Sequence, residues 1–133
     1  MADDTKRLEG ANILVVDDDP DVSDVVNAAL RAEGANTKQC SDGNSAVALC
    51  EQDEPDLVVL DMMLPKRSGF LVLERIKEME NPPHVIMITA NEGKRHQAYA
   101  ESLGVDAYLH KPVRLERLVQ LASELVGSDA KGD

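Results

Sequence analysis

The fold is indicated most clearly by residues 57–69, whose sequence is LVVLDMMLPKRSG. Its first four residues form a continuous apolar run of strand length, which is typical of a strand buried on both faces of a parallel sheet. The run ends at Asp61, and Pro65 and Gly69 then mark a loop before the next amphipathic segment. The stretch therefore predicts a buried strand that brings an acidic side chain to the edge of a sheet.

Units of the same kind fill the rest of the chain. Short apolar runs predict further strands at residues 12–16, 36–40, 84–88 and 107–109. Each strand precedes a segment with apolar residues at helical spacing, although residues 93–103 contain few of them and predict the most loosely packed helix. We therefore predict an α/β fold: a flavodoxin-like, doubly wound, five-stranded parallel sheet in the order 2-1-3-4-5, with five helices.

The length of the chain bounds the number of domains. A chain of 133 residues is close to the commonest size of a single globular domain. We predict one domain over residues 11–126, preceded by a flexible tail at residues 1–10 and followed by another at residues 127–133. No linker or internal repeat divides the region between the tails.

The charge balance excludes several classes of function. The chain has 25 acidic and 14 basic side chains, giving a formal net charge of -11, which repels nucleic acids and anionic membranes. No apolar run reaches the roughly 20 residues of a membrane helix, and the N-terminus lacks the pattern of a secretion signal. We expect a cytoplasmic protein that binds neither nucleic acid nor membrane directly.

Two cysteines, Cys40 and Cys50, are separated by ten positions. Without a CxxC pair or a second pair of ligands, neither a dithiol redox motif nor a four-ligand zinc site is available. We expect both to be buried thiols.

Polar residues that could bind a ligand or take part in a reaction follow four of the predicted strands. Asp17 and Asp18 follow the first strand, Asp61 the third, Thr89 the fourth and Lys111 the fifth. Right-handed crossovers place the carboxyl ends of parallel strands at one edge of the sheet, where such folds bind ligands. In the predicted strand order the first and third strands are neighbours, so we expect the three carboxylates to converge.

Such a cluster needs a cation, because two like charges about 4 Å apart cost roughly 4 kcal/mol at an effective dielectric near 20. Oxygen ligands with an open side suit Mg²⁺. A carboxylate beside Mg²⁺ is a plausible nucleophile toward phosphorus, with Lys111 and Thr89 placed to contact phosphoryl oxygens. Singly, each residue has a plainer explanation: the run ending at Pro20 could serve only to cap a helix, a role that we assign to Asp19.

Taken together, these motifs resemble the receiver domains of two-component response regulators, a family that includes the single-domain chemotaxis regulator. The motifs are ILVVDD at residues 13–18, DMMLPKRSG at residues 61–69, Thr89-Ala90, Tyr108 and Lys111-Pro112. The second motif matches the family's phospho-acceptor pattern, in which Met or Leu precedes Pro and Gly lies eight positions after the Asp. The resemblance covers roughly residues 11–126.

The resemblance implies a role for each residue of the site. Asp61 is the phospho-acceptor, and Mg²⁺ is held by Asp18 directly, by Asp17 mainly through water, by Asp61 and by the backbone carbonyl of Met63. Lys111 pairs with the phosphoryl group, and the peptide bond that follows it is typically cis in the family. Such a protein catalyses its own phosphorylation and slow dephosphorylation and is not a conventional turnover enzyme.

The resemblance also implies a two-state switch. Thr89 moves toward the phosphoryl group, Tyr108 rotates inward, and the face formed by the fourth helix, fifth strand and fifth helix changes. The expected partners are a histidine kinase or phosphotransfer protein as donor and a downstream effector, with dimerisation through that face on phosphorylation. A plainer interpretation of Tyr108 is a half-buried core aromatic with its hydroxyl in water.

Two further positions bear on the lifetime of the phosphorylated form. Some relatives that hydrolyse the phosphoryl group rapidly have an amide or acid at such positions, and these groups can orient water. This chain has Met63 two residues after Asp61 and Asn91 two residues after Thr89. We predict slow hydrolysis, because an apolar thioether cannot position the attacking water.

Three alternatives compete with this interpretation. A haloacid-dehalogenase-like phosphatase also has two acids in an Asp-x-Asp motif, which Asp17 and Asp19 match, but this chain lacks the Thr or Val that follows and has no room for a cap. A flavodoxin-like electron carrier needs a Ser/Thr/Gly-rich phosphate cradle where this chain has carboxylates. A pseudo-receiver would bind partners without being phosphorylated.

Overall fold

The computed structural model of the chain describes residues 6–90 and 93–131. The strands are β1 (Asn12–Val16), β2 (Asn36–Cys40), β3 (Leu57–Asp61), β4 (His84–Thr89) and β5 (Ala107–His110). The helices are α1 (Pro20–Ala32), α2 (Gly43–Asp53), α3 (Gly69–Lys77), α4 (Lys94–Ser102) and α5 (Leu115–Lys131). The strands are parallel in the order β2-β1-β3-β4-β5, which confirms the predicted topology.

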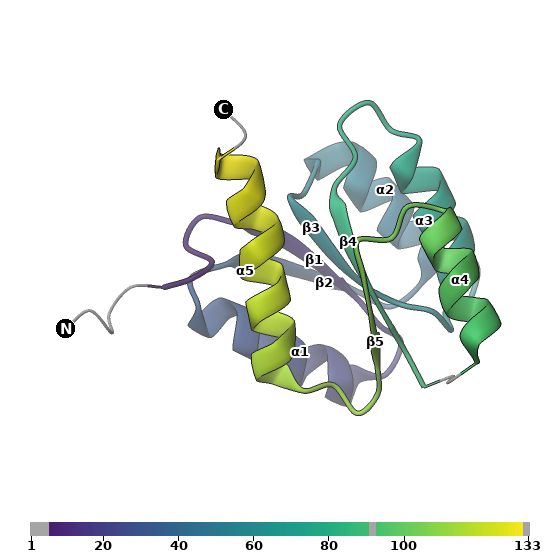
Figure 1. Cartoon of the computed structure of the whole chain (residues 1–133), viewed down its shortest axis with the longest axis horizontal. Coiled ribbons are helices and arrows are strands. Elements are labelled where there is room, and N and C mark those ends of the chain that lie inside the picture. The colour runs from purple at the N-terminus through teal and green to yellow at the C-terminus, as the bar shows by residue number, and fades with distance from the viewer. Residues whose placement is uncertain (1–5, 91–92, 132–133) are drawn as a thin grey trace.

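The helices cover both faces of the sheet. Figure 1 shows α1 and α5 on one face and α2, α3 and α4 on the other. Alternate residues of the central strands point to the two sides, so Val59 packs with the helices of the first face and Val58 with those of the second. All five residues of β3 are buried, as the continuous apolar run predicts.

Helix starts follow the expected capping chemistry. The carboxylate of Asp19 accepts a hydrogen bond from the backbone N–H of Asp21 (3.0 Å) at the start of α1, whose first residue is a proline. Asp42 caps α2 and Ser68 caps α3 in the same way. Helix α4 has no side-chain cap, and of its residues Ala100 alone is buried. The prediction of a loosely packed fourth helix is confirmed.

Both ends of the folded domain extend further than the sequence pattern suggests. The side chain of Leu8 is 1% exposed and belongs to the core on the α1 and α5 face. Arg7 fastens the same segment by ion pairs to Glu33 (3.0 Å) and Glu116 (2.8 Å). Helix α5 continues past Gly127 to Lys131, because one glycine costs a helix only about 1 kcal/mol relative to alanine. The predicted tails are therefore too long at both boundaries.

The cysteines differ from each other in exposure. Cys50 on α2 is buried, and burial raises the pKa of its thiol to about 12. Cys40 ends the edge strand β2 and is only half-buried, which corrects the prediction of two buried thiols; burial raises its pKa to about 11. Of the helices in the described ranges, none is both long and apolar enough to span a membrane.

Candidate functional site

Carboxylates from β1 and β3 meet at the carboxyl edge of the sheet. Val16 is paired with Leu60, so the residues that follow these strands leave the sheet side by side. One carboxylate oxygen each from Asp17, Asp18 and Asp61 lie within 4.8 Å of one another. Asp17 and Asp61 are 5% and 4% exposed, whereas Asp18 is open to solvent. The predicted convergence of the three acids is present.

Backbone amides hold the two buried carboxylates in place. Asp17 Oδ1 accepts a hydrogen bond from the backbone N–H of Asp19 at 2.9 Å. Asp61 Oδ1 accepts a longer one, 3.4 Å, from the backbone N–H of Met63. Asp19 therefore serves both the site, through its backbone, and the start of α1, through its side chain.

The amine of Lys111 closes the site from the end of β5. Its Nζ lies 3.3 Å from Asp17 Oδ2 and 3.5 Å from Asp61 Oδ1. Burial lowers the pKa of Lys111, but the charges of Asp61 and Asp17 outweigh that effect and raise it overall. The Lys111-Pro112 peptide bond is cis, as the family resemblance implies.

Negative charge exceeds positive charge in this cluster. Burial, reinforced by the neighbouring charge of Asp17, raises the pKa of Asp61 to about 6, although Lys111 and the N–H of Met63 act in the opposite direction. The cluster thus has one ammonium and three carboxylates, and the two buried carboxylates are the ones that the ammonium contacts. Hard oxygen donors with one open side and excess negative charge fit Mg²⁺.

Gly69 allows α3 to begin directly against the end of β3. A Cβ atom at this position would lie 2.5 Å from the carbonyl oxygen of Asp61 and 2.7 Å from the Cα of Met62. The backbone N–H of Gly69 donates to the carbonyl of Met62 at 2.9 Å. The spacing of eight residues after Asp61 therefore has a steric cause, which the sequence alone shows only as a pattern.

The two predicted switch residues lie together beside the site. Thr89 is fully buried at the end of β4, and Tyr108 is half-buried on the adjacent strand β5. Burial raises the pKa of Tyr108, and a hydrogen bond with Thr89 opposes that shift. The hydroxyl of Tyr108 also lies 3.8 Å from the sulfur of Met62, a contact that the sequence did not indicate. Asn91 lies outside the described residues.

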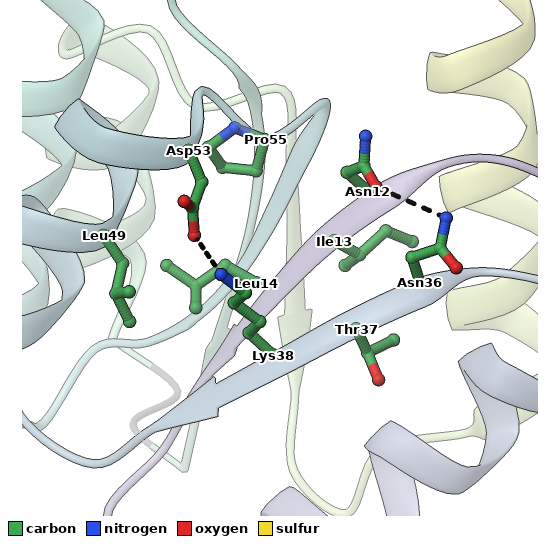
Figure 2. Close-up of a pocket in the computed structure, with 9 residues that line it drawn as sticks. All are labelled: Asn12, Ile13, Leu14, Asn36, Thr37, Lys38, Leu49, Asp53 and Pro55. Carbon is green, nitrogen blue, oxygen red and sulfur yellow. Dashed lines mark hydrogen bonds and ion pairs between the residues drawn. The ribbon is translucent and has the colours of Figure 1, made fainter.

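A cavity lies at the opposite edge of the sheet, where the strands begin (Figure 2). It has a volume of about 310 Å³ and is lined by the first residues of β1 and β2 and the end of α2. Lys38 pairs with Asp53 at 2.7 Å in its wall, and Asn36 donates to Asn12 at 3.4 Å. None of the predicted site residues contributes to this cavity.

Comparisons of sequence identify relatives over most of the chain. The model of the response regulator receiver domain matches residues 13–123. The probable transcriptional regulatory protein TcrX of Mycobacterium tuberculosis is 39% identical over 117 residues, covering 86% of this chain and 50% of TcrX. The DNA-binding dual master transcriptional regulator RpaA of Synechocystis is 38% identical over 109 residues, covering 80% of this chain and 45% of RpaA. The chain thus spans about half the length of these relatives.

Solved structures agree with this assignment. A CheY-like response regulator receiver domain protein from Methanospirillum hungatei matches with a TM-score of 0.87 and 26% identity, covering 92% of this chain and 98% of that one. The receiver domain of the sensor histidine kinase PA1611 from Pseudomonas aeruginosa, solved with magnesium coordinated in its active site cleft, has a TM-score of 0.82 and 29% identity, covering 89% and 98%. With the fold, the family match and the acidic site in agreement, the chain belongs to the response regulator receiver domain family.

Proposed function

We propose that this chain accepts a phosphoryl group on Asp61 in a Mg²⁺-dependent reaction and thereby acts as a signalling switch. The convergence of Asp17, Asp18 and Asp61 with the amine of Lys111 carries this proposal. Asp17 and Asp61 both contact the amine, and Asp61 is the one followed by the family's phospho-acceptor pattern, with Pro65 and Gly69. The family assignment supports the same reaction.

Mg²⁺ would be held by Asp17, Asp18, Asp61 and the backbone carbonyl of Met63. When bound, the ion screens the charge on the incoming phosphoryl group and aligns it for in-line attack. The solved relative from Pseudomonas aeruginosa, which contains magnesium in its active site cleft, supports the choice of this metal. A bound cation would also oppose the effects of burial and of the charge of Asp17, which together raise the pKa of Asp61.

The side chains of Asp61, Lys111 and Thr89 have separate roles in the proposed phosphoryl transfer. An ionised oxygen of Asp61 forms the new bond to phosphorus, while the bond between phosphorus and the donor's leaving group breaks and its electron pair departs with the donor. Lys111, which contacts Asp61 at 3.5 Å, neutralises a phosphoryl oxygen, and the hydroxyl of Thr89 donates to another. The chain catalyses this step on itself and has no turnover substrate.

Phosphorylation would change the α4-β5-α5 face. Thr89 moves toward the phosphoryl group, and Tyr108, which already contacts Thr89 and Met62, settles further inward. Helix α4 is the element best suited to follow, because it buries one residue and lacks a side-chain cap. The phosphorylated chain is expected to dimerise or bind an effector through this face.

The partners follow from the proposed reaction. The donor is a histidine kinase or a phosphotransfer protein in the cytoplasm, and the receiver of the signal is a downstream effector protein or domain. The curated relatives are named as transcriptional regulators and are about twice as long. The charge of -11 makes direct nucleic-acid binding by this segment unfavourable, so any such output belongs to another domain or protein.

The phosphorylated form should be long-lived, because the thioether of Met63 accepts hydrogen bonds too weakly to orient an attacking water. After removal of donor, we expect loss of the phosphoryl group over minutes to hours in the absence of any phosphatase. Intact mass measured over time gives the lifetime, and complete loss within seconds would contradict the expectation.

Incubation with acetyl phosphate and Mg²⁺, followed by intact mass spectrometry, tests the proposal. The wild-type chain should gain one phosphoryl group, whereas Asp61→Asn and a sample containing EDTA should gain none. A pseudo-receiver would gain none under any condition. Labelling that persists in Asp61→Asn would place the acceptor elsewhere.

A further inference from the structure

Met63 differs in exposure from the other methionines of the chain. Its side chain is 66% exposed, whereas Met62 is 3% exposed and Met87 is fully buried. Met79 is half-buried. Among the methionines within the described ranges, Met63 therefore offers its sulfur most freely to reagents in solution.

Met63 also lies directly beside the acceptor carboxylate. Its backbone N–H donates to Asp61 Oδ1 at 3.4 Å, so its position is tied to the carboxylate proposed to carry the phosphoryl group. Buried Thr89 and the amine of Lys111 occupy the inner side of the same site. The exposed side chain of Met63 thus stands on the solvent side, from which a hydrolytic water must approach.

We propose that Met63 is an oxidation site, and that its sulfoxide shortens the lifetime of the phosphoryl group on Asp61. This inference rests on the proposed function and adds a means of regulating the same site. It assigns to the chain a sensitivity to peroxides that acts on the duration of the signal and not on the acceptance of the phosphoryl group.

The oxidation is a two-electron reaction with a peroxide. The thioether sulfur of Met63 attacks one oxygen of hydrogen peroxide, an S–O bond forms and the O–O bond breaks. Sulfur is oxidised to the sulfoxide, and the departing hydroxide takes the proton from the oxygen now bound to sulfur and becomes water. Methionine sulfoxide reductases reverse the change.

The sulfoxide differs from the thioether in the property that governs water positioning. A thioether is a weak acceptor, whereas the sulfoxide is polar and presents an oxygen to water. One neutral hydrogen bond that orients the attacking water corresponds to an acceleration of about two- to tenfold. The carboxylates and the amine of the site are unchanged, so phosphorylation itself should still occur.

The neighbouring methionine provides an internal contrast. The sulfur of Met62 is packed against the hydroxyl of Tyr108 at 3.8 Å and lies in the core on the α2, α3 and α4 face. Oxidation there would require local opening of the core. Among the methionines that the structure describes, Met63 should therefore be the first that dilute peroxide oxidises, and Met62 should stay intact.

The test uses the full chain treated with dilute hydrogen peroxide, with tandem mass spectrometry to locate the added oxygen. Treated and untreated samples are then phosphorylated with acetyl phosphate, freed of donor and followed by intact mass. We expect the oxidised chain to lose its phosphoryl group about two- to tenfold faster. Methionine sulfoxide reductase should restore the slower rate.

Two variants separate Met63 from other sites of oxidation, including the half-buried Cys40. Met63→Leu keeps the apolar bulk without the sulfur, so its lifetime should not respond to peroxide. Met63→Gln imitates the polar sulfoxide and should show the faster loss without any oxidant. Acceleration by peroxide in Met63→Leu, or first oxidation at Met62, would overturn the inference.

The outcomes also distinguish this inference from the proposed function. Equal lifetimes of the oxidised and unoxidised chains, both phosphorylated, would overturn the inference and leave the proposed function standing. If the unoxidised chain gains no phosphoryl group at all, the proposed function fails, and the inference that depends on it fails too.

Discussion

The buried carboxyl group of Asp61 lowers the stability of the fold while it supplies the charge that the proposed reaction needs, and Lys111 offsets only part of this cost. The carboxyl group of Asp61 is 4% exposed and shares its surroundings with Asp17, against one amine. Burial and repulsion raise its pKa to about 6, which means that the folded chain resists ionising this group. The ionised Asp61 that the proposed reaction requires thus imposes a cost on the metal-free fold.

Replacing Asp61 by asparagine should therefore stabilise the metal-free chain by about 1–2 kcal/mol at pH 7.5, a range reduced for partial screening by water. The raised pKa makes wild-type stability fall as the pH rises from about 4 to about 6, so the difference should appear above pH 6 and vanish below pH 4. Urea unfolding in EDTA measures it. Mg²⁺ should stabilise the wild type more than Asp61→Asn, and equal responses would contradict the account.

At the scale of elements, the junction between β3 and α3 sets the geometry of the site. Gly69 brings the first turn of α3 against the backbone of Asp61 and Met62, where no Cβ atom has room. The strands and most helices could be predicted from sequence because their apolar periodicity and capping residues agree. Helix α4 has few apolar residues, which is why the sequence predicts loose packing there and why the helix buries one residue alone.

Gly69→Ala should destabilise the chain by about 1–3 kcal/mol, because the added methyl group must push α3 away from β3. Gly127→Ala is the matched control: its Cβ atom meets nothing within 4 Å in α5, and the change should stabilise by about 0.5–1 kcal/mol. Urea unfolding curves measure both changes. A Gly69→Ala variant as stable as the wild type would show that the junction between β3 and α3 has room for the methyl group, and would contradict this prediction.

The segment before β1 is an element that the sequence pattern missed. Leu8 is a single apolar residue among polar ones, so no periodicity marks it, yet its side chain is buried. Leu8→Ala should cost about 2–4 kcal/mol of unfolding free energy. Leu71→Ala, at a position 54% exposed on α3, should change it by less than about 0.5 kcal/mol. Equal effects of the two substitutions in thermal unfolding would contradict the placement of this segment.

At the scale of the whole molecule, Asp106 joins three elements at the edge opposite the acidic site. Its Oδ2 accepts hydrogen bonds from Lys77 Nζ of α3 (2.8 Å) and from the backbone N–H of Val85 in β4 (2.7 Å), just before β5 begins. Burial raises the pKa of Asp106, but the hydrogen bonds from Lys77 and Val85 outweigh it and lower the pKa overall. The folded chain therefore stabilises the ionised form of Asp106 relative to the protonated form.

Asp106→Asn should destabilise the chain by about 1–2 kcal/mol at pH 7, because a charged acceptor is lost from two hydrogen bonds. A lowered pKa contributes stability above the unfolded value of about 4 and loses it as the pH falls through the folded value. The difference between variant and wild type should therefore shrink below pH 4. Urea unfolding at pH 7 and pH 3 tests this, and a difference independent of pH would exclude the charge as its cause.

The clustering of the site residues could be predicted from sequence, whereas the side-chain packing around them could not. Strand order and strand ends suffice to bring Asp17, Asp18, Asp61 and Lys111 together, because backbone register determines where they leave the sheet. The contact between Tyr108 and Met62 depends on side-chain packing across two strands, which no pattern in the sequence specifies. The half-exposure of Cys40 escaped prediction for the same reason.

The central claim is that acids from β1 and β3 form one Mg²⁺ site, closed by the amine from β5. A crystal structure of the full chain with Mg²⁺ and beryllofluoride tests it most directly. We predict the metal on Asp18, Asp61 and the carbonyl of Met63, and beryllofluoride on Asp61 with Lys111 in hydrogen-bonding contact. Mg²⁺ bound away from Asp61, or Lys111 turned outward to solvent, would contradict it.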